Sequence, residues 1–293
     1  MSGKSYANFG SVLKGILLLS LLALLGGCAS IERLAIPNSD LISTSFTQSG
    51  TQDPLSHEHW NRFLGLYAQT DPDGVVRVNY GSVSDTDHKN LKGYIANLSA
   101  VDTTVLSKNA QLAYWANLYN AATVDVILDH YPVESIRDIR DSPFDLGPWE
   151  NKRLSLRGRP MSLHDIEHGV VRAVWRDTPE IHYILNCAST GCPNLPQTAY
   201  SADTVEDAMR NAAAAYVNDP VRGVNVSPRG RLKVSKIYAW YRDDFGSSDE
   251  ALLDHLRRYA EPDLRAQLEL ARSIGSYFYD WSLNDASIKE SIH

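Results

Sequence analysis

The feature that most constrains the fold is a stretch of 21 residues, 110–130, that is apolar on almost every side. It reads AQLAYWANLYNAATVDVILDH, and its charged residues fall only near the C-terminal end. A helix that is hydrophobic all round is buried, so we expect this one to be central. Asn117 and Asn120 are three positions apart and share a face. Because a buried amide needs hydrogen-bond partners, we expect the pair to tie the helix to loop backbone rather than to bind a ligand.

A second informative stretch, residues 182–196, reads HYILNCASTGCPNLP. Tyr183–Leu185 are apolar or favour β-structure, which predicts a short strand. The strand would stop where Ser, Thr, Gly and two prolines follow, because these residues do not continue a central strand. Loops of this kind frequently carry function, so we interpret residues 187–192, the thiol loop, as part of a site.

The two cysteines of the thiol loop have alternative interpretations. A disulfide between Cys187 and Cys192 would close a very short loop, worth only about 2 kcal/mol, and would mainly fix its shape. Alternatively, one thiol is a nucleophile activated by a nearby base. The four residues between them exceed the spacing of a usual structural zinc pair, and no second pair accompanies them, so we predict no metal site.

The N-terminus predicts export and lipidation. Lys4 and Lys14 precede the apolar run 15–25, which is too short to span a bilayer but fits the core of a signal peptide. It leads into Leu-Gly-Gly-Cys28-Ala-Ser, which resembles the lipobox of a bacterial lipoprotein leader. That resemblance implies a signal peptide over residues 1–27 and an acylated Cys28, with palmitate among its chains. The alternative is an ordinary secretory signal with a chance cysteine.

Export has consequences for location and redox state. Because Ala29 and Ser30 follow Cys28 instead of aspartate, the leader resembles one sorted to the outer membrane in a Gram-negative host. We therefore expect a membrane anchor through Cys28, with the domain facing the periplasm. The bacterial envelope is oxidising, which favours a bridge between the remaining two cysteines. Residues 28–54, rich in Ser, Thr, Asn and Gln, are typical of a flexible tether.

The rest of the chain predicts one α+β domain over residues 55–286, mainly helical with a small, largely antiparallel sheet, and a polar tail over residues 287–293. Periodicity predicts the helices 57–69, 89–98, 110–130, 163–175, 204–218, 247–259 and 261–273, and strands or hairpins within 75–80, 153–163 and 224–234. The net charge of -7 is dispersed, which excludes the basic face that nucleic-acid binding needs.

Several pieces together resemble the family called domain of unknown function 547 (DUF547). They are YWANLYNA at 114–121, SLHDIEHGVVR at 162–172, the stretch 186–193, and YDWSLN at 279–284. The resemblance spans about residues 105 to 284 and implies an exported bacterial member. The family supplies no established reaction. Within the last piece we expect Asp280, Trp281 and Asn284 to shape the site as the chain packs back on the core.

Three functional hypotheses remain open. The first is a non-catalytic envelope lipoprotein that binds a partner or ligand, still unidentified, through residues 142–149 and the aromatic segment 238–245, whose rings could instead be core. The second is a thiol-dependent hydrolase or acyltransferase, with Cys187 as nucleophile, His168 as base and Glu167 or an asparagine orienting the imidazole. The third and weakest is a redox switch through Cys187 and Cys192.

Two further features bear on catalysis. His182 is a poorer base for Cys187, because positions five apart in a regular strand face opposite sides. The sequence has no glycine-rich nucleotide loop, no His-Glu-x-x-His and no Gly-x-Ser-x-Gly motif, so we expect no cofactor.

Overall fold

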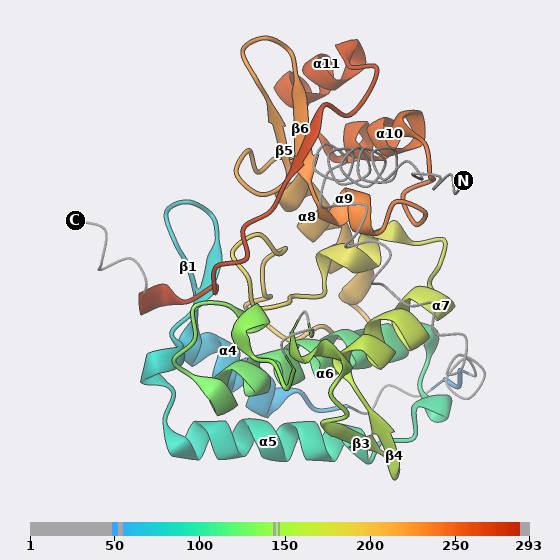
Figure 1. The fold of residues 1–293 in the computed structure, drawn as a ribbon. Coiled ribbons are helices and arrows are strands. Elements are labelled where there is room, and N and C mark those ends of the chain that lie inside the picture. Colours follow the sequence, from blue (N-terminus) through green and yellow to red (C-terminus); the bar gives the residue numbers. More distant parts are fainter. Residues whose placement is uncertain (1–48, 52–54, 143–144, 146, 288–293) are drawn as a thin grey trace, which may run out of the picture.

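The computed structural model describes residues 49–51, 55–142, 145 and 147–287 (Figure 1). The expected signal peptide, Cys28 and nearly all of the tether lie outside these residues, as does most of the polar tail. Among the residues that the structure describes, none of the helices combines the length and the apolar character that crossing a membrane requires.

The lower part of the molecule in Figure 1 is a layer of helices: α4 (Glu58–Tyr67), α5 (Asp85–Ser99) and α6 (Lys108–His130). Helix α6 is the central element that its sequence predicts, because every residue from Ala110 to Val124 is buried. The Ser107 hydroxyl accepts a hydrogen bond from the Ala110 amide and so caps its first turn. Apolar faces of α4, α5 and α6 contribute a large part of the larger hydrophobic core.

The upper part contains α8 (Val205–Val217), α9 (Ile237–Trp240), α10 (Asp249–Tyr259) and α11 (Pro262–Leu270) around a second hydrophobic core. Its strands β5 (Val224–Val226) and β6 (Leu232–Ser235) form the antiparallel hairpin expected within residues 224–234. Strand β7 (Ser276–Phe278) pairs with β6 in parallel.

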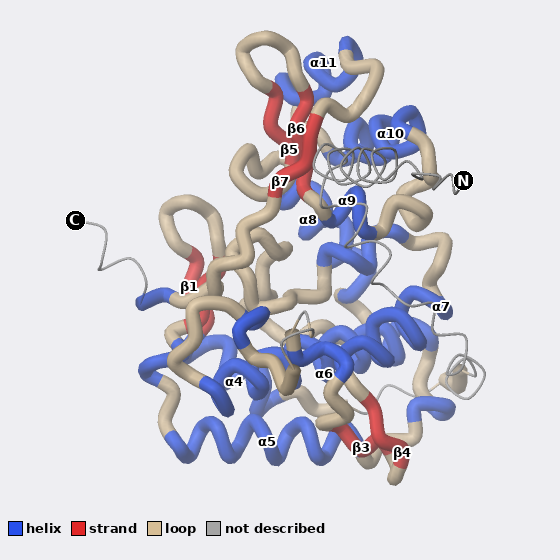
Figure 2. The backbone as a smooth tube through the Cα atoms, in the orientation of Figure 1, coloured by secondary structure: helices blue, strands red, loops and turns tan. Residues whose placement is uncertain are grey.

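Two further hairpins complete the strands. They are β1 (Ala68–Thr70) with β2 (Val76–Val78), and β3 (Leu154–Leu156) with β4 (Arg159–Met161), both antiparallel. The second is the hairpin expected within residues 153–163. The α+β class is confirmed, although the strands form three small sheets where a single sheet was expected (Figure 2).

Residues 279–284, which we call the closing segment, connect the upper part to the lower part. After β7 the chain descends toward β1, as Figures 1 and 2 show. Ser189 bridges to Leu283, and Val78 bridges to Asp285 just beyond the segment. The closing segment therefore packs along the thiol loop, in agreement with the expectation that the C-terminal end returns to the core.

The strand predicted at Tyr183–Leu185 is wrong. Residues Pro179–Tyr183 form a 3₁₀-helix, and an irregular segment follows. The Ile184 carbonyl and the Asn186 amide bond the side chain of Asn120 on α6 instead of a neighbouring strand. A tertiary contact thus satisfies the backbone groups that a sheet would otherwise pair.

Two helices also differ from their predictions. The region 163–175 is mostly a π-helix, Asp165–Val171, followed by the short α7 (Arg172–Val174). Ahead of it, Ser162 and Asp165 cap each other: the Ser162 amide donates to the Asp165 carboxylate, and the Asp165 amide donates to the Ser162 hydroxyl. Helix α10 begins at Asp249, with Ser248 as its cap, whereas the predicted helix began at Ser247, whose φ of 62° is not helical.

Candidate functional site

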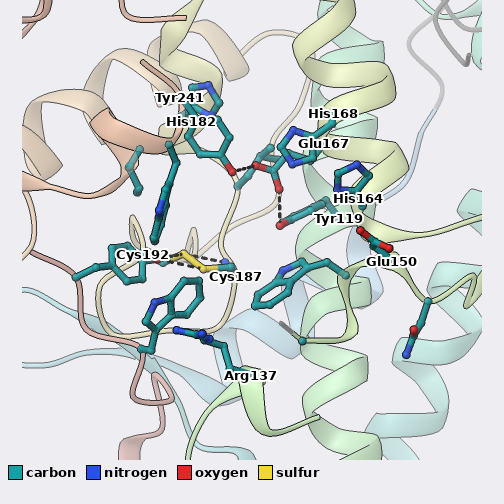
Figure 3. A pocket seen from close by; sticks show the side chains of 18 of the residues that line it. Tyr119, Arg137, Glu150, His164, Glu167, His168, His182, Cys187, Cys192 and Tyr241 are labelled. Atoms are coloured by element: carbon teal, nitrogen blue, oxygen red, sulfur yellow. Dashed lines mark hydrogen bonds between the residues drawn. A yellow bond between two sulfur atoms is a disulfide. The ribbon is translucent and has the colours of Figure 1, made fainter. Parts of the chain in front are cut away.

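A cavity of about 610 Å³ lies where the π-helix, the thiol loop, α9 and the closing segment converge (Figure 3). Its lining residues are Tyr119, Arg137, Asp145, Gly147, Trp149, Glu150, Asn151, His164, Glu167, His168, His182, Leu185, Cys187, Cys192, Ile237, Trp240, Tyr241, Tyr279 and Trp281. The wall therefore combines aromatic rings with a small number of carboxylates, imidazoles and one guanidinium.

The two cysteines of the thiol loop are joined by a disulfide that faces this cavity (Figure 3). Their Cα atoms are 6.2 Å apart, within the range that a disulfide spans. The Tyr279 hydroxyl lies 3.2 Å from each sulfur and 2.9 Å from the Ser189 hydroxyl. Ala188, between the cysteines, has a φ of 59°, which is uncommon for a residue other than glycine. The thiol loop is thus fixed from several directions.

The closing segment lies directly against the thiol loop. The Gly191 amide donates to the Asp280 carbonyl at 2.8 Å, and the Thr190 amide donates to the Ser282 carbonyl at 2.8 Å. A Cβ atom on Gly191 would lie 2.8 Å from the backbone N and O of Asp280, so only glycine fits without a shift. Asp280 therefore shapes the loop through its backbone, while its own carboxylate accepts a bond from the Ser282 amide.

Trp281 and Asn284, the other two residues expected to shape the site, have different positions. Trp281 lines the cavity, and its ring packs against Trp149 and Trp240 at centroid distances of 5.7 and 5.4 Å. Asn284 is buried behind the wall, where its side-chain oxygen accepts a bond from Tyr80 at 2.9 Å. It therefore supports the wall without lining the cavity.

Each of the two asparagines of α6 donates one side-chain hydrogen bond to loop backbone and accepts another from it. Asn120 donates to the Ile184 carbonyl at 2.9 Å and accepts from the Asn186 amide at 2.8 Å. Asn117 donates to the Tyr200 carbonyl at 2.8 Å and accepts from the Tyr200 amide at 3.0 Å. Asn120 consequently positions the chain immediately before Cys187.

Glu167 is a buried carboxylate, 8% exposed, on the wall of the cavity. Tyr119 donates to one of its oxygens at 2.8 Å and Tyr241 donates to the other at 2.5 Å. Burial disfavours the charged form, but the neighbouring His168 and the hydrogen bond from Tyr241 outweigh it, so the pKa of Glu167 is lowered. Among the described residues, no lysine or arginine forms an ion pair with this carboxylate.

His168 is held in one protonation state. Its Nδ1 lies 2.9 Å from Nη1 of Arg172, and because a guanidinium only donates, Nδ1 accepts and the ring proton is on Nε2. Burial lowers the pKa of His168 to about 3, so the imidazole is neutral at neutral pH. A neutral ring in this tautomer can donate from Nε2, but its only lone pair is already engaged by Arg172.

His182 also lines the cavity, in contrast to the expectation from strand geometry, because its segment is a 3₁₀-helix. Its Nε2 lies 2.7 Å from Asp244, which also accepts two bonds from Arg172 at 2.7 and 2.9 Å. Burial disfavours the charged form of Asp244, and the bonds from His182 and Arg172 outweigh it and hold the pKa of Asp244 well below its usual value. The His182 ring stacks on Tyr241 at 3.9 Å.

The structure brings together most of the predicted site residues: Glu167, His168, Cys187, Cys192 and Trp281 all line one cavity. The hydrogen-bond partners of the Cys187 sulfur include the hydroxyls of Ser189 and Tyr279.

Sequence reasoning missed the residues that complete the site: Tyr119, Arg137, Tyr241, Asp244 and Tyr279. Of these, only Arg137 lies outside every stretch that the sequence singled out. Tyr241 and Asp244 belong to the segment 238–245, and Tyr119 and Tyr279 belong to the pieces 114–121 and 279–284.

Both segments that were suggested as a binding surface contribute to the cavity. Asp145, Gly147 and Trp149 come from residues 142–149, and Trp240 and Tyr241 come from residues 238–245. The ends of the second segment, Tyr238 and Phe245, are instead buried in the upper core, as the alternative interpretation of those aromatics predicted.

A separate group of possible metal ligands lies between α5 and α6. Ligand atoms of His88, Asp125 and Asp129 lie within 4.8 Å of one another. The Lys92 ammonium is 2.8 Å from Oδ1 of both aspartates and already takes the position of a cation there. We therefore interpret this group as an ion-pair network.

Comparison with known proteins gave one match. Neither the curated proteins nor the solved structures include one that matches the chain significantly. The matched family model covers α6, the π-helix and the thiol loop, but not the closing segment. Residues 103–217 match the model of a family described as "Protein of unknown function, DUF547".

Proposed function

We propose that the protein is an exported lipoprotein, anchored through acylated Cys28 in the outer membrane of a bacterial envelope, whose domain binds a small organic ligand without transforming it. The lipobox-like sequence supports the anchor. The cavity supports the binding role, and the domain would face the periplasm.

The observation that carries the binding proposal is the composition of the cavity wall. Its volume of about 610 Å³ falls in the range of about 300–1,000 Å³ that is usual for small-molecule sites. Trp149, Trp240 and Trp281 provide apolar surface, while Glu167 and Arg137 provide a few polar groups. A wall that combines aromatic and apolar surface with placed polar groups is typical of ligand pockets.

The alternative, a thiol-dependent hydrolase or acyltransferase, has one observation in its favour: Cys187, His168 and Glu167 line the same cavity. Two features count against it. A nucleophile must be a thiolate, whereas Cys187 is in a disulfide. A general base needs a free lone pair, whereas Nδ1 of His168 accepts from Arg172. Binding is therefore the better-supported function.

The anchor is tested by growing bacteria that express the full-length protein with labelled palmitate. We expect the wild type to be labelled and recovered with the outer membrane, and the Cys28→Ala variant to be unlabelled. An unlabelled wild type would contradict the anchor and would leave the binding role to be judged separately.

The binding role is tested with full-length protein purified in detergent and incubated with an envelope extract filtered to keep molecules below about 1 kDa. Native mass spectrometry should detect a retained species, unchanged in mass from the extract. Trp281→Ala should lose it, and the matched control Tyr277→Ala, in β7 and outside the cavity wall, should keep it. Retention of nothing, or equal retention by both variants, would count against the proposal. Conversion that requires prior reduction of the protein would favour the enzyme instead.

A further inference from the structure

We propose that the ligand carries a protonated amine on an apolar or aromatic body, and that the Glu167 carboxylate binds this amine inside the cavity. This inference rests on the proposed binding function and names the chemical class of its ligand.

The first argument is that Glu167 forms no ion pair with a lysine or arginine among the described residues. Its two oxygens accept bonds from the neutral hydroxyls of Tyr119 and Tyr241, and an ionised carboxylate has about four acceptor sites, so capacity remains. Buried charges are normally paired with an opposite charge. Glu180 is a comparable case, because it is 9% exposed and also accepts from a tyrosine, Tyr259, yet Arg258 lies 3.7 Å from it.

The second argument is the charge of the cavity wall. Among the described lining residues, Asp145, Glu150 and Glu167 are acidic and Arg137 alone is a guanidinium. Arg172, which lies over the Tyr241 ring, is already paired with Asp244. Arg137 lies over the Trp281 ring, 5.1 Å from its centroid, and Figure 3 shows it at the opposite end of the cavity from Glu167.

The histidines of the wall do not offset this acidic charge. Burial lowers the pKa values of His164, His168 and His182, so these rings are neutral at neutral pH. The Glu167 end of the cavity therefore attracts cations.

The third argument is the aromatic lining. The Trp281 ring packs against those of Trp149 and Trp240 on the wall, and Tyr241 adds a fourth ring beside Glu167. Aromatic faces attract cations and also bury apolar groups. An ammonium group attached to an apolar body is attracted by the carboxylates and the ring faces and buries its apolar part among the rings. The carboxylates would repel an anion.

The test uses three probes of similar size and different charge: phenethylamine, phenethyl alcohol and 3-phenylpropanoate. Their affinities for full-length protein in detergent are measured by isothermal titration calorimetry at pH 7.5. We expect phenethylamine to bind the wild type at least tenfold more tightly than the other two. Glu167→Gln should lose that preference, and the matched buried carboxylate variant Glu180→Gln should keep it.

The wild-type comparison decides the question even if Glu167→Gln does not fold. Equal or tighter binding of the alcohol or the propanoate would overturn the amine inference while leaving ligand binding in place. If none of the probes binds but the envelope extract gives a Trp281-dependent species, again only the amine inference fails. If neither the probes nor the extract gives binding, both proposals fail.

Discussion

Replacing Asn120 by alanine should destabilise the protein strongly. The side-chain amide of Asn120 bonds the backbone ahead of the thiol loop, where a neighbouring strand would otherwise do so. The side chain is fully buried and makes two hydrogen bonds, to the Ile184 carbonyl and from the Asn186 amide. Both of those residues are buried as well, at 1% and 3% exposure. Alanine would leave a donor and an acceptor without partners, at about 1–3 kcal/mol each.

The expected loss is therefore about 2–6 kcal/mol, a large share of the roughly 5–15 kcal/mol that stabilises a typical domain. The assay is chemical denaturation followed by circular dichroism. The matched control is Asn97→Ala, an exposed position on α5, which should change the free energy of unfolding by less than about 0.5 kcal/mol. If Asn120→Ala unfolds with the same free energy as this control, the amide does not hold the loop and the reasoning is refuted.

Three further predictions concern the surroundings of the cavity and the upper core. Replacing both Cys187 and Cys192 by serine should lower the free energy of unfolding by about 2 kcal/mol, because the short loop is no longer closed. Wild type reduced with dithiothreitol should lose the same amount. Unequal losses would contradict loop closure as the source of the stabilisation. Burial lowers the pKa of His255 to about 4, below about 6.5 in the unfolded chain, so the unfolded state binds more protons between these values. Stability should be complete above about pH 6.5 and fall toward pH 4, and His255→Gln should flatten this slope in denaturation curves recorded across that range. Gly191→Ala should lower the melting temperature because its Cβ would meet backbone at 2.8 Å, whereas Gly93→Ala, with open space in a helix, should raise it or leave it unchanged.

Features governed by local sequence were predictable. The all-round apolar character of residues 110–130 identified the central helix, and turn residues between apolar alternations identified the hairpins β3–β4 and β5–β6. The apolar pattern and the turn residues each act over a few consecutive residues, so a single sequence is enough to recognise them. The period of residues 163–175 likewise identified a helix, although not its π-helical geometry.

Features governed by distant contacts were not predictable. Tyr183–Leu185 has the composition of a strand, but Asn120, more than sixty positions earlier, supplies its hydrogen bonds. Tyr241 reaches Glu167 across 74 positions, and Tyr119 reaches it across 48. Sequence reasoning found Glu167 on its helix but had no means of pairing it with the two phenols, and therefore could not identify it as a buried carboxylate that neutral hydroxyls bond.

The central claim is that Glu167 receives a cationic ligand group inside the cavity. The most direct test is carbon-13 NMR of protein labelled at its glutamate side-chain carboxyls and titrated with phenethylamine. We predict that the Glu167 carboxyl resonance shifts in a saturable way while that of Glu180, which already has an arginine nearby, stays in place. Saturable binding that leaves the Glu167 resonance unmoved would contradict the claim.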